Sequence, residues 1–96
     1  MSTEELAAKY IASAEKVLSS LTKTQTPITV NEATVSEVLR WAHDYLEDAK
    51  YYKDQGKLGT SLTSVAYCEG LLDGLRLMGA VNFVWPTRQQ NQESKE

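Results

Sequence analysis

The sequence predicts an all-α fold, a three-helix up-and-down bundle with a short extended C-terminal segment. Three observations predict it. Three stretches repeat their apolar residues with the 3.6-residue period of a helix face. Capping residues and glycines stand at the ends of these stretches. Residues 80–85 alternate with a period of two, which is typical of extended chain. The 96 residues allow one domain, which we place at residues 1–86.

The first predicted helix spans residues 3–21. Ser2 and Glu5 have the spacing of a capping box, which starts a helix at the residue after the serine. One face of this helix is apolar, so we expect it to pack on a core. The residues of that face are Leu6, Tyr10, Ala14, Val17, Leu18 and Leu21. A loop over residues 22–31, broken by Pro27, follows it.

The second predicted helix spans residues 33–55, and two caps compete for its start. Asn31 permits an early start, whereas Thr34 with Glu37 forms another capping box. A regular apolar stripe predicts the core face, and one shoulder of that stripe is aromatic. The shoulder residues are Trp41, Tyr45 and Tyr52. The shoulder either packs against another helix or forms a partner surface, because Trp and Tyr are favoured at interfaces.

The third predicted helix spans residues 58–78. The short link Gly56-Lys57 makes it an antiparallel neighbour of the second helix, and Gly79 is a natural left-handed residue after its end. Its apolar arc is wide enough to touch two neighbours. That arc includes Leu58, Leu62, Val65, Cys68, Leu71, Leu72 and Leu75. A stripe of small residues, Ala66, Gly70 and Gly74, indicates either a close helix–helix approach or a shallow groove.

Three charged residues of this helix lie where apolar residues are expected. Glu69, Asp73 and Arg76 continue the face of Leu58 and Leu62 on a helical wheel. One interpretation is an ion-paired seam at the end of the bundle. The other is a ligand site, since carboxylates near apolar surface have the raised pKa values of acid–base groups. We expect Cys68, on the apolar arc, to be a packed thiol.

Composition excludes several classes of function. The net charge of −3 and the scattered basic residues argue against nucleic acid as a partner. No apolar run approaches the length of a membrane span, and the N-terminus is acidic where a signal peptide is basic, so we expect a cytoplasmic chain. A lone His43 without ligand spacing predicts no metal site, and no cofactor motif is present. We expect the polar residues 87–96 to be disordered.

Residues 49–85 combine a tyrosine-rich helix end, a glycine turn, and a helix reading roughly S-x-A-Y-x-E-G-x-x-D-x-x-R-x-x-G. The positions of this pattern are Tyr51, Tyr52, Gly56, Ser64, Ala66, Tyr67, Glu69, Gly70, Asp73, Arg76 and Gly79. In this pattern the segment resembles an archaeal family known as domain of unknown function three-five-seven. The resemblance implies a three-helix bundle and an archaeal source. Through relatives that carry a nucleotidyltransferase-like domain, it also implies an accessory role in nucleotide chemistry.

Two functions compete. The first is a non-catalytic protein-interaction or accessory module, which binds a protein partner or a second copy of itself. Its candidate interface residues are Trp41, Tyr45, Phe83 and Trp85. The alternative is binding or hydrolysis of a small, nucleotide-related ligand on the third helix. Its candidate residues are Tyr52, Tyr67, Glu69, Asp73 and Arg76. The sequence leaves open whether the chain is an enzyme and favours a non-catalytic role.

Overall fold

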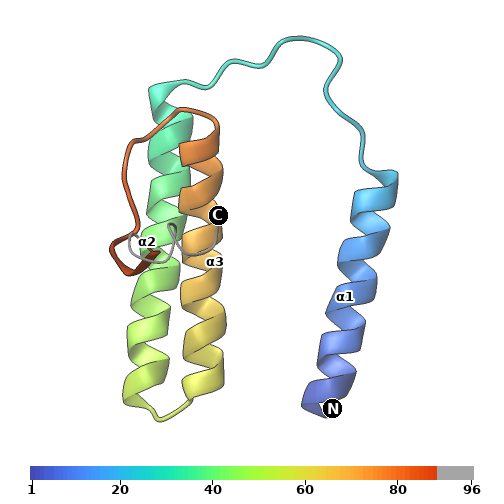
Figure 1. Ribbon diagram of the computed structural model, residues 1–96, viewed down its shortest axis with the longest axis vertical. Helices are drawn as coiled ribbons and strands as arrows, with labels where there is room; N and C mark the ends of the chain where they lie inside the picture. The colour runs from blue at the N-terminus through green and yellow to red at the C-terminus, as the bar shows by residue number, and fades with distance from the viewer. Residues whose placement is uncertain (89–96) are drawn as a thin grey trace.

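The computed structural model describes residues 1–88, and the chain over these residues is all-α (Figure 1). Its elements are α1 (Thr3–Ser20), α2 (Glu32–Asp54), α3 (Leu58–Leu77) and a 3₁₀ turn, η1 (Pro86–Arg88). No strand forms within the described residues. The predicted fold class and the three predicted helices are confirmed, with ends that agree to within one residue.

Helix α1 begins with the predicted capping box. The Glu5 backbone N–H donates to Ser2 Oγ at 3.0 Å, and the Ser2 N–H donates to Glu5 Oε1 at 2.8 Å. Two of the four backbone donors that a helix start leaves unpaired are thereby satisfied. The same bonds lower the pKa of the Glu5 carboxyl, chiefly through the Ser2 backbone N–H.

The start of α2 decides between the two competing caps. Asn31 is the N-cap residue, and its side chain accepts a hydrogen bond from the Thr34 backbone N–H at 2.9 Å. The Thr34–Glu37 capping box is therefore wrong. Asn31 has the extended backbone that an N-cap needs, with ψ at 169°, whereas Thr34 already lies inside the helix.

Helices α2 and α3 form an antiparallel hairpin, with the turn at Gly56 (Figure 1). Gly56 has φ of +78° and Gly79, just after α3, has φ of +79°. An L-residue with a side chain rarely adopts this left-handed conformation, so both glycines end helices as predicted.

The core of the hairpin is small. Its buried side chains are Ala42, Ala49, Cys68 and Leu75. The two alanines lie on α2 and allow α3 to approach closely. The Ser61 hydroxyl of α3 donates to the Ala49 carbonyl at 2.7 Å, which adds a polar link between the helices near the turn. Burial of Cys68 confirms that it is a packed thiol.

The structure differs from the expected bundle in the position of α1. Within the described residues α1 packs on neither α2 nor α3, and none of its residues is buried (Figure 1). The expectation that its apolar face covers a core is therefore wrong for this structure. The physical reason is the linker over residues 21–31. Its two ends, Leu21 and Asn31, have extended backbones with ψ of 155° and 169°, and it bends at residues 25–26, so no helix of the linker holds α1 on the hairpin.

The C-terminal segment is extended over residues 81–85, as predicted, and returns along the hairpin (Figure 1). Phe83 and Trp85 are half-buried there. Residues 86–88 form the turn η1, and the rest of the predicted disordered tail, residues 89–96, lies outside the described residues. Among residues 1–88, no helix combines the length and hydropathy that a membrane span requires.

Candidate functional site

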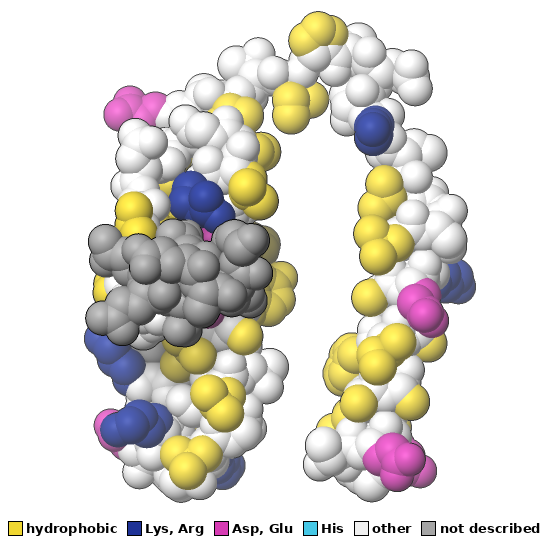
Figure 2. Space-filling view, in the orientation of Figure 1, with side chains coloured by type: hydrophobic (Ala, Val, Ile, Leu, Met, Phe, Trp, Pro, Cys, Tyr) yellow, Lys and Arg dark blue, Asp and Glu magenta, His cyan; other side chains and the backbone are white. Residues whose placement is uncertain are grey.

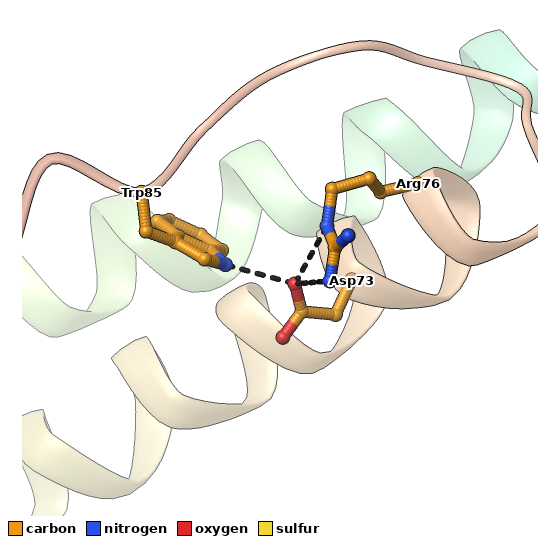
Figure 3. Close-up of polar contacts among 3 residues, drawn as sticks. All are labelled: Asp73, Arg76 and Trp85. Atoms are coloured by element: carbon orange, nitrogen blue, oxygen red, sulfur yellow. Dashed lines mark hydrogen bonds and ion pairs between the residues drawn. The ribbon is translucent and has the colours of Figure 1, made fainter. Parts of the chain in front are cut away.

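Asp73 lies at the centre of the polar contacts that join α3 to the C-terminal segment (Figure 3). Trp85 Nε1 donates to Asp73 Oδ1 at 2.8 Å. Arg76 reaches the same oxygen through Nη2 at 3.3 Å and Nε at 3.4 Å. A half-buried carboxylate that accepts from a ring N–H and a guanidinium holds both donors in place.

The aromatic rings beside Asp73 complete this contact. Phe83 and Trp85 meet edge to face, with ring centroids 4.8 Å apart and planes at 78°. The Arg76 guanidinium lies over the Phe83 ring at 5.8 Å from its centroid, within the range of a cation–π interaction. We call Asp73, Arg76, Phe83 and Trp85 the Asp73 cluster. It fastens the extended segment to α3.

The structure divides the five predicted ligand residues among different places. Asp73 and Arg76 are paired, and half-buried Glu69 lies one helical turn before Asp73. Tyr67 precedes Glu69 by two residues, so it points to the opposite side of α3. There it stacks on Tyr45 of α2, with centroids 4.3 Å apart and planes at 13°.

Tyr52 lies near the end of α2 and meets its neighbour Tyr51 edge to face, with centroids 5.2 Å apart. It is half-buried, whereas Tyr51 is exposed. This ring contact lies within α2. A ligand role for the five residues stays a prediction.

The predicted interface residues also separate. Trp41 is 52% exposed on α2, while Tyr45 is half-buried by its stack on Tyr67. Phe83 and Trp85 belong to the Asp73 cluster. Trp41 and Tyr45, with two aspartates, line a shallow hollow on the surface of α2. Trp41 is therefore the member of this set that remains open to a partner.

Sequence reasoning missed a hollow at the end of the hairpin where α2 begins and α3 ends. Its volume is about 620 Å³. Its apolar lining residues include Val35 and Leu39 of α2, Met78, and Val81 of the extended segment. The alternation of residues 80–85 gave a signal for extended chain but not for the side on which Val81 lies. That side depends on the path taken after Gly79.

Cys68 carries a buried free thiol in the core of the hairpin. Burial raises the pKa of its thiol above the ordinary value of 9.0, and the neighbouring Glu69 carboxylate raises it further. A raised pKa keeps the thiol protonated and unreactive at neutral pH.

His43 is exposed on α2, with Nε2 4.0 Å from Glu47 Oε2. Within residues 1–88, no three metal-ligating side chains gather at one point.

The small-residue stripe of α3 does not serve a close approach to α2. A Cβ placed on Gly70 or Gly74 would meet no atom within 4 Å outside its immediate helix neighbourhood. The expectation of close helix packing at these glycines is therefore wrong within this chain. The stripe lies on a side of α3 that no described helix covers.

A row of apolar and small residues winds along α3 here. Residues spaced four apart form one ridge on a helix surface, and we call the ridge on this side the outer row. The outer row consists of Leu58, Leu62, Ala66, Gly70, Gly74 and Met78. Leu58 is 60% exposed and Leu62 69% exposed, although the sequence placed both on the core-facing arc. Glu69 and Asp73 flank the row, since they lie three residues after Ala66 and Gly70.

The apolar face of α1 is the second uncovered surface. Its large residues are all exposed in this structure, and they are Leu6, Tyr10, Ile11, Val17, Leu18 and Leu21. Figure 2 shows hydrophobic side chains along the side of α1 that is turned toward the hairpin, and others along the facing edge of the hairpin. Among the described residues, the apolar face of α1 thus packs on no other element, and no helix covers the outer row. Exposed apolar surface of this extent is typical of interaction sites.

Comparison with known families and proteins adds one finding. The sequence model of the family described as "Protein of unknown function (DUF357)" matches residues 9–81. The match covers α2 and α3 completely and α1 from residue 9 onward, and it includes the Asp73–Arg76 pair and the outer row. Comparisons of the chain with curated proteins and with solved structures gave no match.

Proposed function

The chain belongs to the DUF357 family, and we propose that it acts as a non-catalytic protein-interaction module. One observation carries the proposal. Helix α1 presents six large apolar side chains and packs on no other described element. An amphipathic helix gains most of its stability from packing its apolar face, so α1 needs a protein surface to cover it.

The outer row of α3 supports the same function. It is a second apolar surface, with large side chains at its two ends and small residues between them. A helix with small residues on its surface admits the backbone of another helix at short range. Glu69 and Asp73 flank the row, and Asp73 is already paired with Arg76 and Trp85. An amphipathic helix laid in an apolar groove is a common mode of protein recognition.

The ligand-binding alternative has less support from the geometry. Of its five residues, Asp73 and Arg76 bind each other and Trp85, and Tyr67 stacks on Tyr45. No observation indicates that a small molecule binds these residues, so we do not propose a ligand-binding or hydrolytic function. An archaeal and cytoplasmic setting stays a prediction of the sequence.

Accessibility of α1 in solution tests the interaction function. We would compare Ile11→Cys, on the apolar face, with Ala12→Cys, on the opposite face, by the rate of alkylation over a dilution series. Native Cys68, which is 6% exposed, serves as the internal standard for a covered thiol. At high dilution we expect the Ile11→Cys thiol to react as fast as the Ala12→Cys thiol.

The opposite outcome has a clear meaning. If the thiol of Ile11→Cys stays as protected as Cys68 at every dilution, α1 is closed onto its own hairpin. No apolar helix face would then remain for a partner, and we would abandon the proposed function.

A further inference from the structure

We infer that α2 carries a binding site for an arginine side chain of a partner protein, formed by Trp41, Asp44, Tyr45 and Asp48. These residues line a shallow hollow of about 320 Å³ on the surface of α2. The site uses neither the apolar face of α1 nor the outer row of α3. The inference therefore goes beyond the proposed function and does not depend on what covers α1.

The spacing of the four residues places them on one side of the helix. Asp44, Tyr45 and Asp48 follow Trp41 by three, four and seven residues, and side chains at these separations share a helix face. We call this face the acidic–aromatic ridge. From Trp41 to Asp48 the helix rises about 10 Å, which three residues of an extended partner segment would span.

Tyr45 is the member of the ridge that the fold holds in place. Its ring stacks on Tyr67 of α3, with centroids 4.3 Å apart and planes at 13°. The side chain is half-buried by this contact. Because the ring is already fixed by the hairpin, little side-chain freedom remains to be lost when a ligand binds beside it.

Trp41 supplies the open aromatic surface. Its side chain is 52% exposed, and with residues 1–88 its indole makes neither a ring contact nor a hydrogen bond. The face of an indole attracts cations more strongly than the face of any other protein ring. Tryptophan is also enriched among the residues that contribute most to protein–protein binding.

The two aspartates supply negative charge that the described chain does not neutralise. Among residues 1–88 neither forms an ion pair, whereas Glu47 of the same helix lies 3.0 Å from Lys50 Nζ. Glu37, four residues before Trp41, extends the ridge with another exposed carboxylate. Arg40 is near in sequence but lies beyond ion-pair distance of these carboxylates. The ridge is therefore complementary to a positively charged group from outside the described chain.

An arginine fits this combination better than a lysine does. The guanidinium is planar, so its face can lie on the Trp41 indole while its N–H groups, which lie in the plane, donate to Asp44 and Asp48. A lysine ammonium is a compact, strongly hydrated charge and does not stack. A protein is the source that suits the shallow hollow, because a small free ligand would bury too little of its surface there.

The indole N–H signals in a nuclear magnetic resonance titration give the first test. The chain has two tryptophans, so each spectrum holds one signal from the site and one internal reference. The probe is a capped Gly-Gly-Arg-Gly-Gly peptide added to the isotope-labelled full chain. We expect the Trp41 signal to shift saturably, whereas that of Trp85, which donates to Asp73 at 2.8 Å, stays in place.

Two matched peptides test the chemistry of the ligand. Citrulline in place of arginine keeps the shape of the side chain but removes its charge, and it should give no shift. Lysine in place of arginine keeps the charge but removes the planar group. We expect it to bind several-fold more weakly than the arginine peptide.

Variants of α2 test the residues of the site. Asp44→Asn and Asp48→Asn should each raise the dissociation constant of the arginine peptide about two- to fivefold, the range expected for exposed ion pairs. Glu47→Gln removes the same charge one residue from Asp48, but its carboxylate is paired with Lys50, so the constant should not change. An unmoved Trp85 signal verifies the fold of each variant.

Four outcomes would overturn the inference. The first is a Trp41 signal that does not respond to the arginine peptide, and the second is one that responds equally to citrulline. Equal affinity for the lysine peptide would remove the reason for choosing arginine. Equal effects of Asp48→Asn and Glu47→Gln would indicate attraction to the overall negative charge of the chain. The alkylation of Ile11→Cys tests the proposed function separately, so either proposal can fail alone.

Discussion

At the residue scale, the contacts of Asp73 show which neighbours a helical wheel can predict and which it cannot. The wheel correctly marked Glu69, Asp73 and Arg76 as charges out of place, and it correctly placed Arg76 within reach of Asp73. It could not supply Trp85, because that donor is 12 residues away along a chain whose path depends on Gly79 and the extended segment. A neighbour fixed by local geometry was predictable, and a neighbour brought by tertiary packing was not.

Loss of the Trp85–Asp73 hydrogen bond should destabilise the hairpin. Asp73→Asn weakens an acceptor that is half-buried and charged, so we expect the free energy of unfolding to fall by about 1–2 kcal/mol. Trp85→Phe keeps the ring but removes the donor and should cost a similar amount. Urea unfolding followed by circular dichroism measures both.

A matched control for this pair exists on α2. Glu47 and Lys50 are also three residues apart, with Nζ 3.0 Å from Oε2, but both side chains are more than half exposed. Water screens such a pair, so Glu47→Gln should leave stability unchanged within error. Additive losses in the Asp73→Asn, Trp85→Phe double variant would contradict a direct bond between the two side chains.

Cys68 makes a prediction about pH. Its pKa is raised in the folded chain, so the folded state holds its proton at a pH where the unfolded state has lost it. By linkage, this thiol's contribution to stability is fully present below pH 9 and is lost as the pH rises above it. Iodoacetamide should therefore alkylate the native thiol far more slowly than the urea-unfolded thiol at pH 8. Equal rates would mean that the hairpin core is open.

At the scale of the element, the helix ends were the most predictable part of the fold. Capping residues and glycines act within a few residues of themselves, so Ser2, Gly56 and Gly79 do in the structure what the sequence indicates. The start of α2 was ambiguous because two local signals overlap there. Both signals were chemically valid, and only the backbone conformation of Asn31 decides between them.

This ambiguity can be tested with two alanine variants. Asn31→Ala removes the side chain that caps α2 and should cost about 1 kcal/mol of stability. Thr34→Ala removes a hydroxyl that caps nothing, while the backbone N–H that Asn31 binds remains. It should therefore be neutral or slightly stabilising in urea unfolding. A larger loss from Thr34→Ala than from Asn31→Ala would restore the later start.

At the scale of the whole molecule, the sequence predicted three helices but not which of them touch. An apolar face shows that a helix will be covered, and it is silent about the surface that covers it. The face of α1 and the outer row of α3 therefore looked like parts of one closed bundle. The linker over residues 21–31 separates them in the structure, and a loop rich in Thr gave no sign of its direction.

A molecule with this architecture should become more stable as its concentration rises. The hairpin has four buried side chains, and an isolated helix of 18 residues is marginal in water. A second copy is one protein partner that would cover α1, and its binding would stabilise the folded state by mass action. We expect the thermal midpoint to rise with protein concentration in the full chain and to be constant for Leu18→Glu. A constant midpoint in both would indicate that association adds nothing to folding.

The linker over residues 21–31 has a further consequence for how the chain can be taken apart. Lys23 lies exposed in it, three residues beyond the end of α1. Trypsin acting at this bond would divide the molecule into a short helical peptide and a hairpin, with the backbone of both intact. The two fragments would then form a complementation pair, in which the peptide, added from outside, can be tested for binding to the hairpin.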